Sequence, residues 1–204
     1  MNISQQYDDG NYAEVIKYLA DKSNTDKELE MLGYAYQKTG AWEKGMNVWN
    51  HLILKYPTNA YYYSERGVCK FNLRFKHAIQ DFNKAVELQP ETSYFYSCRA
   101  FIKDKTGDTE GAVEDYNKAH KLDPEDALLL NNLGLAEQKL GYTQKARERF
   151  KNSDDLLGIK TIESRSEPES TPPKGTLWQE IKKMISSKEG FMQFLKELGI
   201  SKNK

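Results

Sequence analysis

The formal net charge of the 204-residue chain is zero, because 30 lysines and arginines balance 30 aspartates and glutamates. This balance gives no overall field that would favour nucleic acid as a partner. No apolar run approaches the roughly 18 residues that a membrane span requires, and the length suits one ordinary domain with a small appendage.

The first element in chain order is a truncated copy of a unit that recurs later. Within residues 1–25, GNYAEVIKYL has the pattern of a turn followed by a helix. Four fuller copies follow, and Pro57, Pro90 and Pro124 recur near their ends at intervals of 33 and 34 residues. A fixed period of this length is typical of a stacked repeat array. We assign the copies to residues 26–59, 60–92, 93–126 and 127–158.

Three columns of residues recur within these copies. Small residues on two helices allow close approach, and an aromatic four residues after the second small column fills the space beside them. A unit of this size cannot bury its own apolar face, so its stability depends on its neighbours. The columns are Gly33, Gly67, Ala100 and Gly134; Gly45, Ala78, Ala112 and Ala146; and Trp49, Phe82, Tyr116 and Phe150.

These columns resemble the tetratricopeptide repeat, a family of 34-residue helix–turn–helix units. The resemblance covers roughly residues 26–158 and implies an all-α, right-handed superhelical solenoid of four repeats plus an N-terminal partial repeat. Two departures stand out. The second copy is one residue short at its turn, NLRFKHA, and the fourth has Ser153 at the small position before Gly158 and no closing proline.

The resemblance also implies a binding surface. In this family, repeat positions 2, 5, 9, 12 and 13 of each first helix line a concave groove where peptides bind. Apolar side chains dominate these positions here, which favours an apolar or amphipathic ligand. The alternative is that some of them complete the packing between adjacent first helices. The candidate groove residues are Tyr34, Lys38, Tyr61, Ser64, Val68, Phe71, Tyr94, Ser97, Phe101, Lys105, Leu128, Asn131 and Leu135.

One well-known ligand class of the family is not expected. Its co-chaperone members grip a C-terminal carboxylate with lysine and asparagine side chains at set groove positions. In this chain, Glu30 and Tyr34 occupy the first two of those positions. The resemblance therefore does not extend to a carboxylate clamp.

The repeat pattern ends before a segment of different composition. Residues 159–175 are rich in Pro, Ser, Thr and Glu, as in a flexible linker. Residues 176–200 then show apolar residues at helical spacing, and residues 174–204 contain seven lysines against three glutamates, a net charge of +4. We expect an amphipathic, basic helical tail whose contact residues are Trp178, Ile181, Ile185, Phe191, Phe194 and Leu198.

No pattern in the chain indicates catalysis, a cofactor or a metal. His51, His77 and His120 fall in separate repeats, and the Cys and His spacing does not match a metal site. The N-terminal MNISQQYDDG has no secretion signal, so we expect a soluble, cytoplasmic protein in which Cys69 and Cys98 are buried thiols.

The sequence predicts a non-catalytic protein–protein interaction scaffold. Its partner is a protein or peptide, with the tail of the same chain or of a sister chain as one candidate, and no small-molecule substrate is expected. The alternative function is a regulatory subunit of an enzyme or of a membrane-surface assembly, recruited through the basic tail. For the tail itself, an external partner, a cap on the array and a membrane anchor are the other interpretations.

Overall fold

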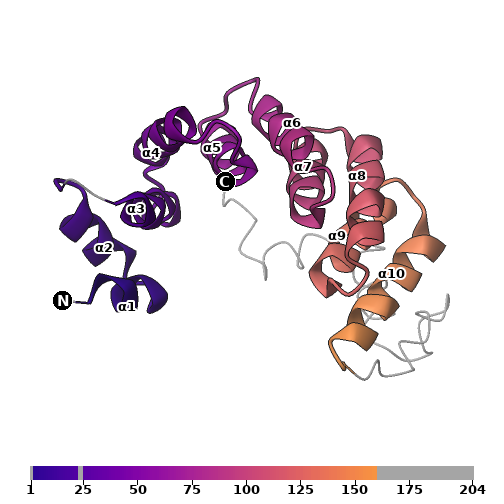
Figure 1. Ribbon diagram of the computed structural model, residues 1–204. Helices are drawn as coiled ribbons and strands as arrows, with labels where there is room; N and C mark the ends of the chain where they lie inside the picture. Colours follow the sequence, from indigo (N-terminus) through magenta and orange to yellow (C-terminus); the bar gives the residue numbers. More distant parts are fainter. Residues whose placement is uncertain (1, 23–24, 160–204) are drawn as a thin grey trace, which may run out of the picture. The chain divides into compact units, whose positions relative to one another are not determined.

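The computed structural model describes residues 2–22 and 25–159, in which every regular element is an α-helix (Figure 1). The chain divides into two units, Met1–Lys160 and Thr161–Lys204, and the described residues belong to the first. Apart from Ile159, the expected linker and tail lie outside the described residues. The helices are α1 (Ile3–Asp8), α2 (Tyr12–Leu19), α3 (Asp26–Lys38), α4 (Trp42–Lys55), α5 (Ala60–Asn72), α6 (Ile79–Leu88), α7 (Ser93–Lys105), α8 (Thr109–Leu122), α9 (Ala127–Lys139) and α10 (Thr143–Leu156).

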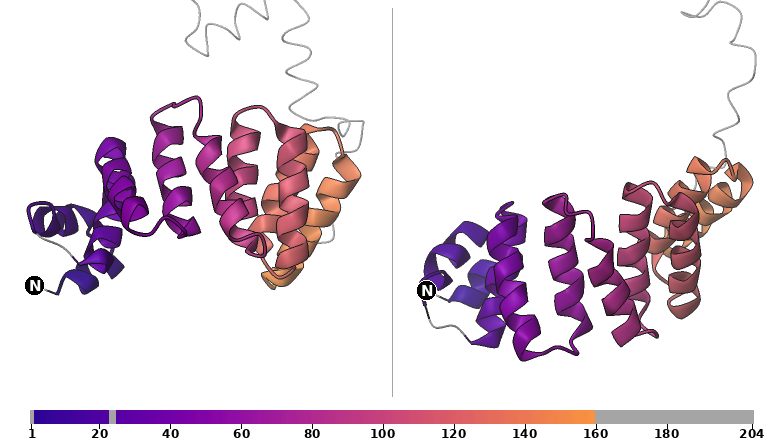
Figure 2. Two further views of the ribbon diagram at one scale, coloured as in Figure 1. Left: turned by 45° about the horizontal axis from the view of Figure 1, so that its top comes forward. Right: turned by 90° about the horizontal axis from the view of Figure 1, so that it is seen from above.

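The described helices form a solenoid of consecutive pairs. Each helix packs on the next one in the chain, and α7 also contacts the first helices of the neighbouring pairs, α5 and α9. Both further views show the same succession from α1 to α10 (Figure 2). Each of the four full copies contains one pair, and the truncated copy contains α2 preceded by the short α1. The all-helical repeat architecture expected from the sequence is confirmed.

The turn inside each pair requires a left-handed backbone conformation. Gly40, Gly107 and Gly141 adopt it two residues after the ends of α3, α7 and α9, with φ of +77°, +98° and +81°. Glycine adopts this conformation without steric cost. In the shortened second copy the same place is taken by Arg74, with φ of +60°. The following helix α6 has ten residues, whereas α4, α8 and α10 each have fourteen.

Each pair closes where a small residue of the first helix meets an aromatic of the second. Trp49, Phe82 and Tyr116 are buried. A Cβ atom placed on Gly67 would lie 2.7 Å from Cε2 of Phe82, and the corresponding glycines of the first and fourth pairs are equally close to Trp49 and Phe150. The absence of a side chain therefore sets how closely the two helices approach.

The apolar core consists of separate clusters that bridge neighbouring units. One cluster joins Val15 and Leu19 of α2 to Met31 and Leu32 of α3. Others link α4 to α5 and α6 to α7, and the last extends from α7 and α8 into α9. Because the clusters span unit boundaries, each pair depends on its neighbours, as expected for a solenoid.

Buried ion groups hold the second and third pairs together. In the third pair, Arg99 of α7 donates two hydrogen bonds to Asp115 of α8, at 2.7 and 2.8 Å, and Lys103 lies 2.9 Å from the same carboxylate. The second pair repeats this arrangement with Arg66, Lys70 and Asp81 at equivalent positions. Both aspartates are almost fully buried.

The other two pairs depart from this arrangement in different ways. In the fourth pair the charges are inverted, because Glu137 lies on the first helix and Arg149 on the second, 3.6 Å apart. In the first pair the equivalent positions are apolar or aromatic: Leu32, Tyr36 and Val48. Leu32 and Tyr36 belong to the core, and Val48 packs against it.

The small–aromatic contact can be tested by a double-mutant cycle at the second pair. Gly67→Ala should destabilise the protein by about 1 kcal/mol, since overpacking outweighs the better helix propensity of alanine. Phe82→Leu alone leaves a cavity and should cost about 1 kcal/mol. Together they should cost at least about 0.5 kcal/mol less than the sum, because leucine frees space for the new methyl group. Urea unfolding of the four proteins measures the coupling, and additive losses would contradict the contact.

The buried ion groups should contribute more to the free energy of unfolding than surface ion pairs do. Asp115→Ala leaves Arg99 and Lys103 without their buried counter-charge and should lower the free energy of unfolding by about 2–3 kcal/mol. The matched control is Glu87→Ala, which removes an exposed i,i+3 pair with Lys84 and should change it by less than about 0.5 kcal/mol. Equal losses in chemical denaturation would show that burial is not the decisive factor.

Candidate functional site

A row of exposed apolar side chains runs along the first helices of the pairs. Tyr61, Tyr94, Phe101, Leu128 and Leu135 are each more than one third exposed, and Leu128 reaches 72%. Monomeric proteins seldom leave contiguous apolar side chains in water unless they bind something. Together with three half-buried neighbours these residues form what we call the A-helix face: Tyr34, Tyr61, Val68, Phe71, Tyr94, Phe101, Leu128 and Leu135.

The polar residues expected in the groove have different positions. Lys38, Lys105 and Asn131 are exposed, and Ser97 is half-buried. Ser64 is fully buried, which corrects its assignment to a groove surface. Burial raises the pKa of the nearby Cys98 thiol of α7, and Tyr94 and Ser64 oppose that rise. The reason is that α7 packs against α5 and covers this position.

At the N-terminal end of the A-helix face, three tyrosines pack together. The ring of Tyr34 lies with its centroid 5.7 Å from that of Tyr7 and 6.0 Å from that of Tyr12. Lys38 lies over the Tyr34 ring, 4.9 Å from its centroid. Burial is the main cause that raises the pKa of Tyr7 to about 12. The truncated copy therefore contributes two aromatic rings to this end of the face.

A buried carboxylate, Glu65, lies in the middle of the same helices. It is one turn after Tyr61 on α5 and only 6% exposed. The hydroxyl of Tyr94 donates a hydrogen bond to Oε1 of Glu65 at 3.4 Å, and Nε2 of Gln37 donates to the Glu65 main-chain oxygen at 2.9 Å. These two hydrogen bonds join α3 and α7 to α5 at Glu65.

Glu65 was not among the groove residues expected from the sequence, because it occupies repeat position 6, outside the expected stripe. A signal was nevertheless present. The equivalent residues of the other copies are Met31, Cys98 and Asn132, so a carboxylate appears at a position that is uncharged in every other full copy.

The electrostatics of Glu65 are unfavourable for a charged group. Burial raises the pKa of its carboxyl, while hydrogen bonds from Gln37, Tyr94 and Tyr61 and the charge of Lys38 oppose that shift. Burial also raises the pKa of Tyr94, and the charge of Glu65 contributes to that rise. Within the described part of the chain, no basic side chain lies within ion-pair distance of the Glu65 carboxylate.

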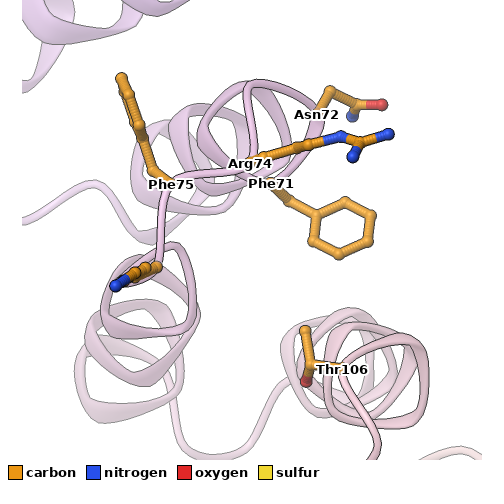
Figure 3. A pocket seen from close by; sticks show the side chains of 6 residues that line it. Phe71, Asn72, Arg74, Phe75 and Thr106 are labelled. Atoms are coloured by element: carbon orange, nitrogen blue, oxygen red, sulfur yellow. The ribbon is translucent and has the colours of Figure 1, made fainter.

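A pocket of about 470 Å³ lies beside the face, where α5 turns into α6. Figure 3 shows the Phe71 ring directed toward the space between this turn and Thr106. Arg74, the residue with positive φ, and the half-exposed Phe75 belong to the same wall. An adjoining pocket of about 320 Å³ extends from Phe71 to Ile102. The pockets thus place Phe71 at the border between the A-helix face and the shortened turn.

The remaining candidates do not form a second site. His51 lies on α4, His120 on α8, and His77 in the turn before α6. The described ranges contain no group of three or more His, Cys, Asp or Glu that could hold a metal ion. Within the same ranges, no helix has both the length and the apolar character needed to cross a membrane. The expected tail contact residues, from Trp178 to Leu198, lie outside the described residues.

The paired helices, the small–aromatic contacts and the glycine turns define a helical-repeat solenoid. Two family profiles agree with it: a tetratricopeptide repeat profile matches residues 29–59, and a TPR repeat profile matches residues 102–141. The chain therefore contains tetratricopeptide repeats, and these repeats support a protein–protein interaction scaffold. No curated protein has a sequence similar enough to match it.

Several solved structures share the fold. A crystal structure of MamA aligns with a TM-score of 0.62 at 21% identity, covering 78% of this chain and 96% of MamA. MamA 41-end from Desulfovibrio magneticus RS-1 gives a TM-score of 0.65 at 20% identity, covering 78% of this chain and 92% of the MamA chain. MamA AMB-1 gives a TM-score of 0.61 at 20% identity, covering 76% of this chain and 95% of the MamA AMB-1 chain. At these identities the likeness shows the fold alone.

The raised pKa of Glu65 predicts a pH-dependent cost to the fold. The folded state binds the Glu65 proton more tightly than the unfolded state, so folding loses stability as pH rises from about 4.5 through the raised pKa. Glu65→Gln should therefore unfold at a higher temperature than the wild type at pH 7, with the difference disappearing near pH 4.

The control for this prediction is Glu28→Gln, which should show the opposite trend. Hydrogen bonds from Thr25 lower the pKa of Glu28, so its contribution to stability is present near neutral pH and is lost as pH falls through the lowered pKa. Thermal unfolding of both variants between pH 4 and 7 provides the test. A Glu65 variant less stable than the wild type at pH 7 would contradict the assigned cost.

Proposed function

We propose that the protein is a non-catalytic scaffold that binds an apolar or amphipathic segment along the A-helix face. The supporting observation is the exposed row of Tyr61, Tyr94, Phe101, Leu128 and Leu135 on successive first helices. Aromatic side chains are frequent anchors in interfaces because they bury a large area at a small entropic cost. The repeat architecture is one in which such an extended surface serves binding.

The charges near the face favour a ligand that is not acidic. Glu30 occupies the first clamp position and accepts a hydrogen bond from Tyr62, and Glu65 lies further along. An acidic segment would meet two carboxylates, which would cost affinity. A segment that combines apolar residues with basic ones placed at Glu30 and Glu65, away from the exposed Lys38 and Lys105, avoids this cost.

The C-terminal tail of this chain has that composition, and we propose it as the occupant. Residues 174–204 carry a net charge of +4 and include the anchors Trp178, Phe191 and Phe194. The 17-residue linker, 159–175, has a root-mean-square span of roughly 23 Å and a maximum of about 55 Å. A tether of this length presents the tail at roughly millimolar effective concentration. Weak contacts are then sufficient for binding.

Deletion of residues 176–204 should uncover the face. We expect binding of a fluorescent apolar dye to rise several-fold, because the exposed side chains lose their cover. A synthetic peptide of residues 176–200 should rebind the shortened chain and displace the dye. Dye titration and fluorescence anisotropy measure these effects.

Matched serine substitutions identify the surface involved. Leu128→Ser on α9 should weaken peptide binding about tenfold or more. Leu54→Ser on α4 should leave it unchanged, although Leu54 is 85% exposed, because it lies outside the face. Equal effects of the two substitutions, or no change in dye binding on deletion, would contradict the proposal.

A further inference from the structure

The shortened second copy lacks the first turn of its second helix. In the other three pairs the second helix begins two residues after the glycine with positive φ, at Trp42, Thr109 and Thr143. In the second pair, α6 begins only at Ile79, five residues after Arg74. The residues between them form a turn, in which the amide of Ala78 donates a hydrogen bond to the carbonyl oxygen of Phe75 at 3.2 Å. A stretch that is helical in the other pairs is therefore a compact turn here.

An apolar space of about 320 Å³ lies beside this turn and the end of α7, and we call it the turn pocket. Its apolar walls include Phe71, Ile79 and Ile102, from three different helices. Ile102 is buried, and the other two are half-buried. Ligand sites in proteins begin at about this volume. The turn pocket can therefore receive one leucine-sized or phenylalanine-sized side chain.

Two exposed cations, Arg74 and Lys76, border the turn pocket and the larger pocket that adjoins it. Figure 3 shows the Arg74 side chain extending from the turn on the same side as the Phe71 ring. Within residues 2–22 and 25–159, neither cation has a carboxylate within ion-pair distance. Both charges are therefore available to a ligand.

The other charged groups of the turn pocket already have partners. Lys103 lies 2.9 Å from the Asp115 carboxylate and donates a hydrogen bond to the carbonyl oxygen of Gly111 at 3.3 Å. The carboxylate of Asp108 caps α8 and accepts a hydrogen bond from the Gly111 amide at 2.9 Å. A carboxylate at a helix N-terminus is stabilised there by the helix dipole. The charges without a partner at this site are thus the two cations.

We propose that the turn pocket binds an acidic segment of a partner protein, with an apolar side chain in the pocket and a neighbouring carboxylate at Arg74 and Lys76. Arginine can donate two parallel hydrogen bonds to one carboxylate, which makes it a favoured partner of this group. Residues 174–204 carry a net charge of +4 and do not have this chemistry. The A-helix face favours a ligand that is not acidic, so the inference does not depend on the proposed function.

The test is a methyl NMR titration of the full-length protein with the synthetic peptide acetyl-Asp-Phe-Asp-amide. The matched peptide acetyl-Asn-Phe-Asn-amide keeps the ring and removes the charges. The acidic peptide should shift the methyl signals of Ile79 and Ile102 to saturation. It should bind at least about fivefold more tightly than the neutral peptide, because only the acidic peptide can pair with the two cations.

Single-charge variants identify the cations that act. Arg74→Gln and Lys76→Gln should each weaken binding of the acidic peptide about threefold, and together about tenfold, as expected for exposed charges. Lys151→Gln removes an exposed lysine from α10 and should leave the affinity near that of the wild type. All these variants should retain the helical circular dichroism of the wild type, because the substituted side chains are exposed.

Insertion of one alanine after Arg74 tests whether the shortened turn creates the site. The insertion restores the spacing of the other pairs, so α6 should gain a turn and fill the space. The acidic peptide should then no longer shift the Ile102 methyl signal, although the protein should still unfold cooperatively. Binding that persists in this variant would contradict the assigned origin of the turn pocket.

Three other results would overturn the proposal. Equal affinity for the two peptides would show that the cations do not recognise a carboxylate. An equal loss of affinity in Lys151→Gln and Arg74→Gln would show a general charge effect. Shifts confined to the methyl groups of Leu128 and Leu135 would show that the peptide binds the A-helix face instead.

Discussion

The contact between a small residue, glycine in three pairs and Ala100 in the third, and an aromatic ring determines the geometry of the helix pairs. At Gly33 and Gly67 there is no space for a side chain, because the rings of Trp49 and Phe82 occupy it. The close approach buries the ring completely and orients the first helix, so that one side packs in the core and another remains available. The exposed row on successive first helices is a consequence of this repeated orientation.

Charge is used in two different ways in the same array. Between the helices of a pair, Asp81 and Asp115 are compensated by arginine and lysine, and these groups join α5 to α6 and α7 to α8. On the A-helix face, Glu65 has no such partner among the described residues. Among the described residues, three of the four buried acids thus have an ion-pair partner, whereas Glu65 accepts a hydrogen bond from Tyr94.

The sequence was sufficient for the features that repeat and insufficient for those that occur once. Small residues, aromatics and turn glycines recur at fixed spacing, so the helix pairs and their contacts were predictable. Ser64 was assigned to the surface by its repeat position, but α7 covers it. Glu65 and the positive φ of Arg74 each occur in a single copy. Such features depend on tertiary contacts that no periodicity reveals.

The inverted charge pair of Glu137 and Arg149 has a consequence for folding. Repeats of similar sequence present a folding chain with several nearly equivalent partners for each helix, and mispaired helices are a common kinetic trap in such arrays. If α10 packed against α7, Arg149 would face Arg99 and Lys103, and the two like charges would repel it. The reversed polarity thus marks α9 and α10 as partners of each other, and it gives the last pair an identity that its neighbours cannot imitate.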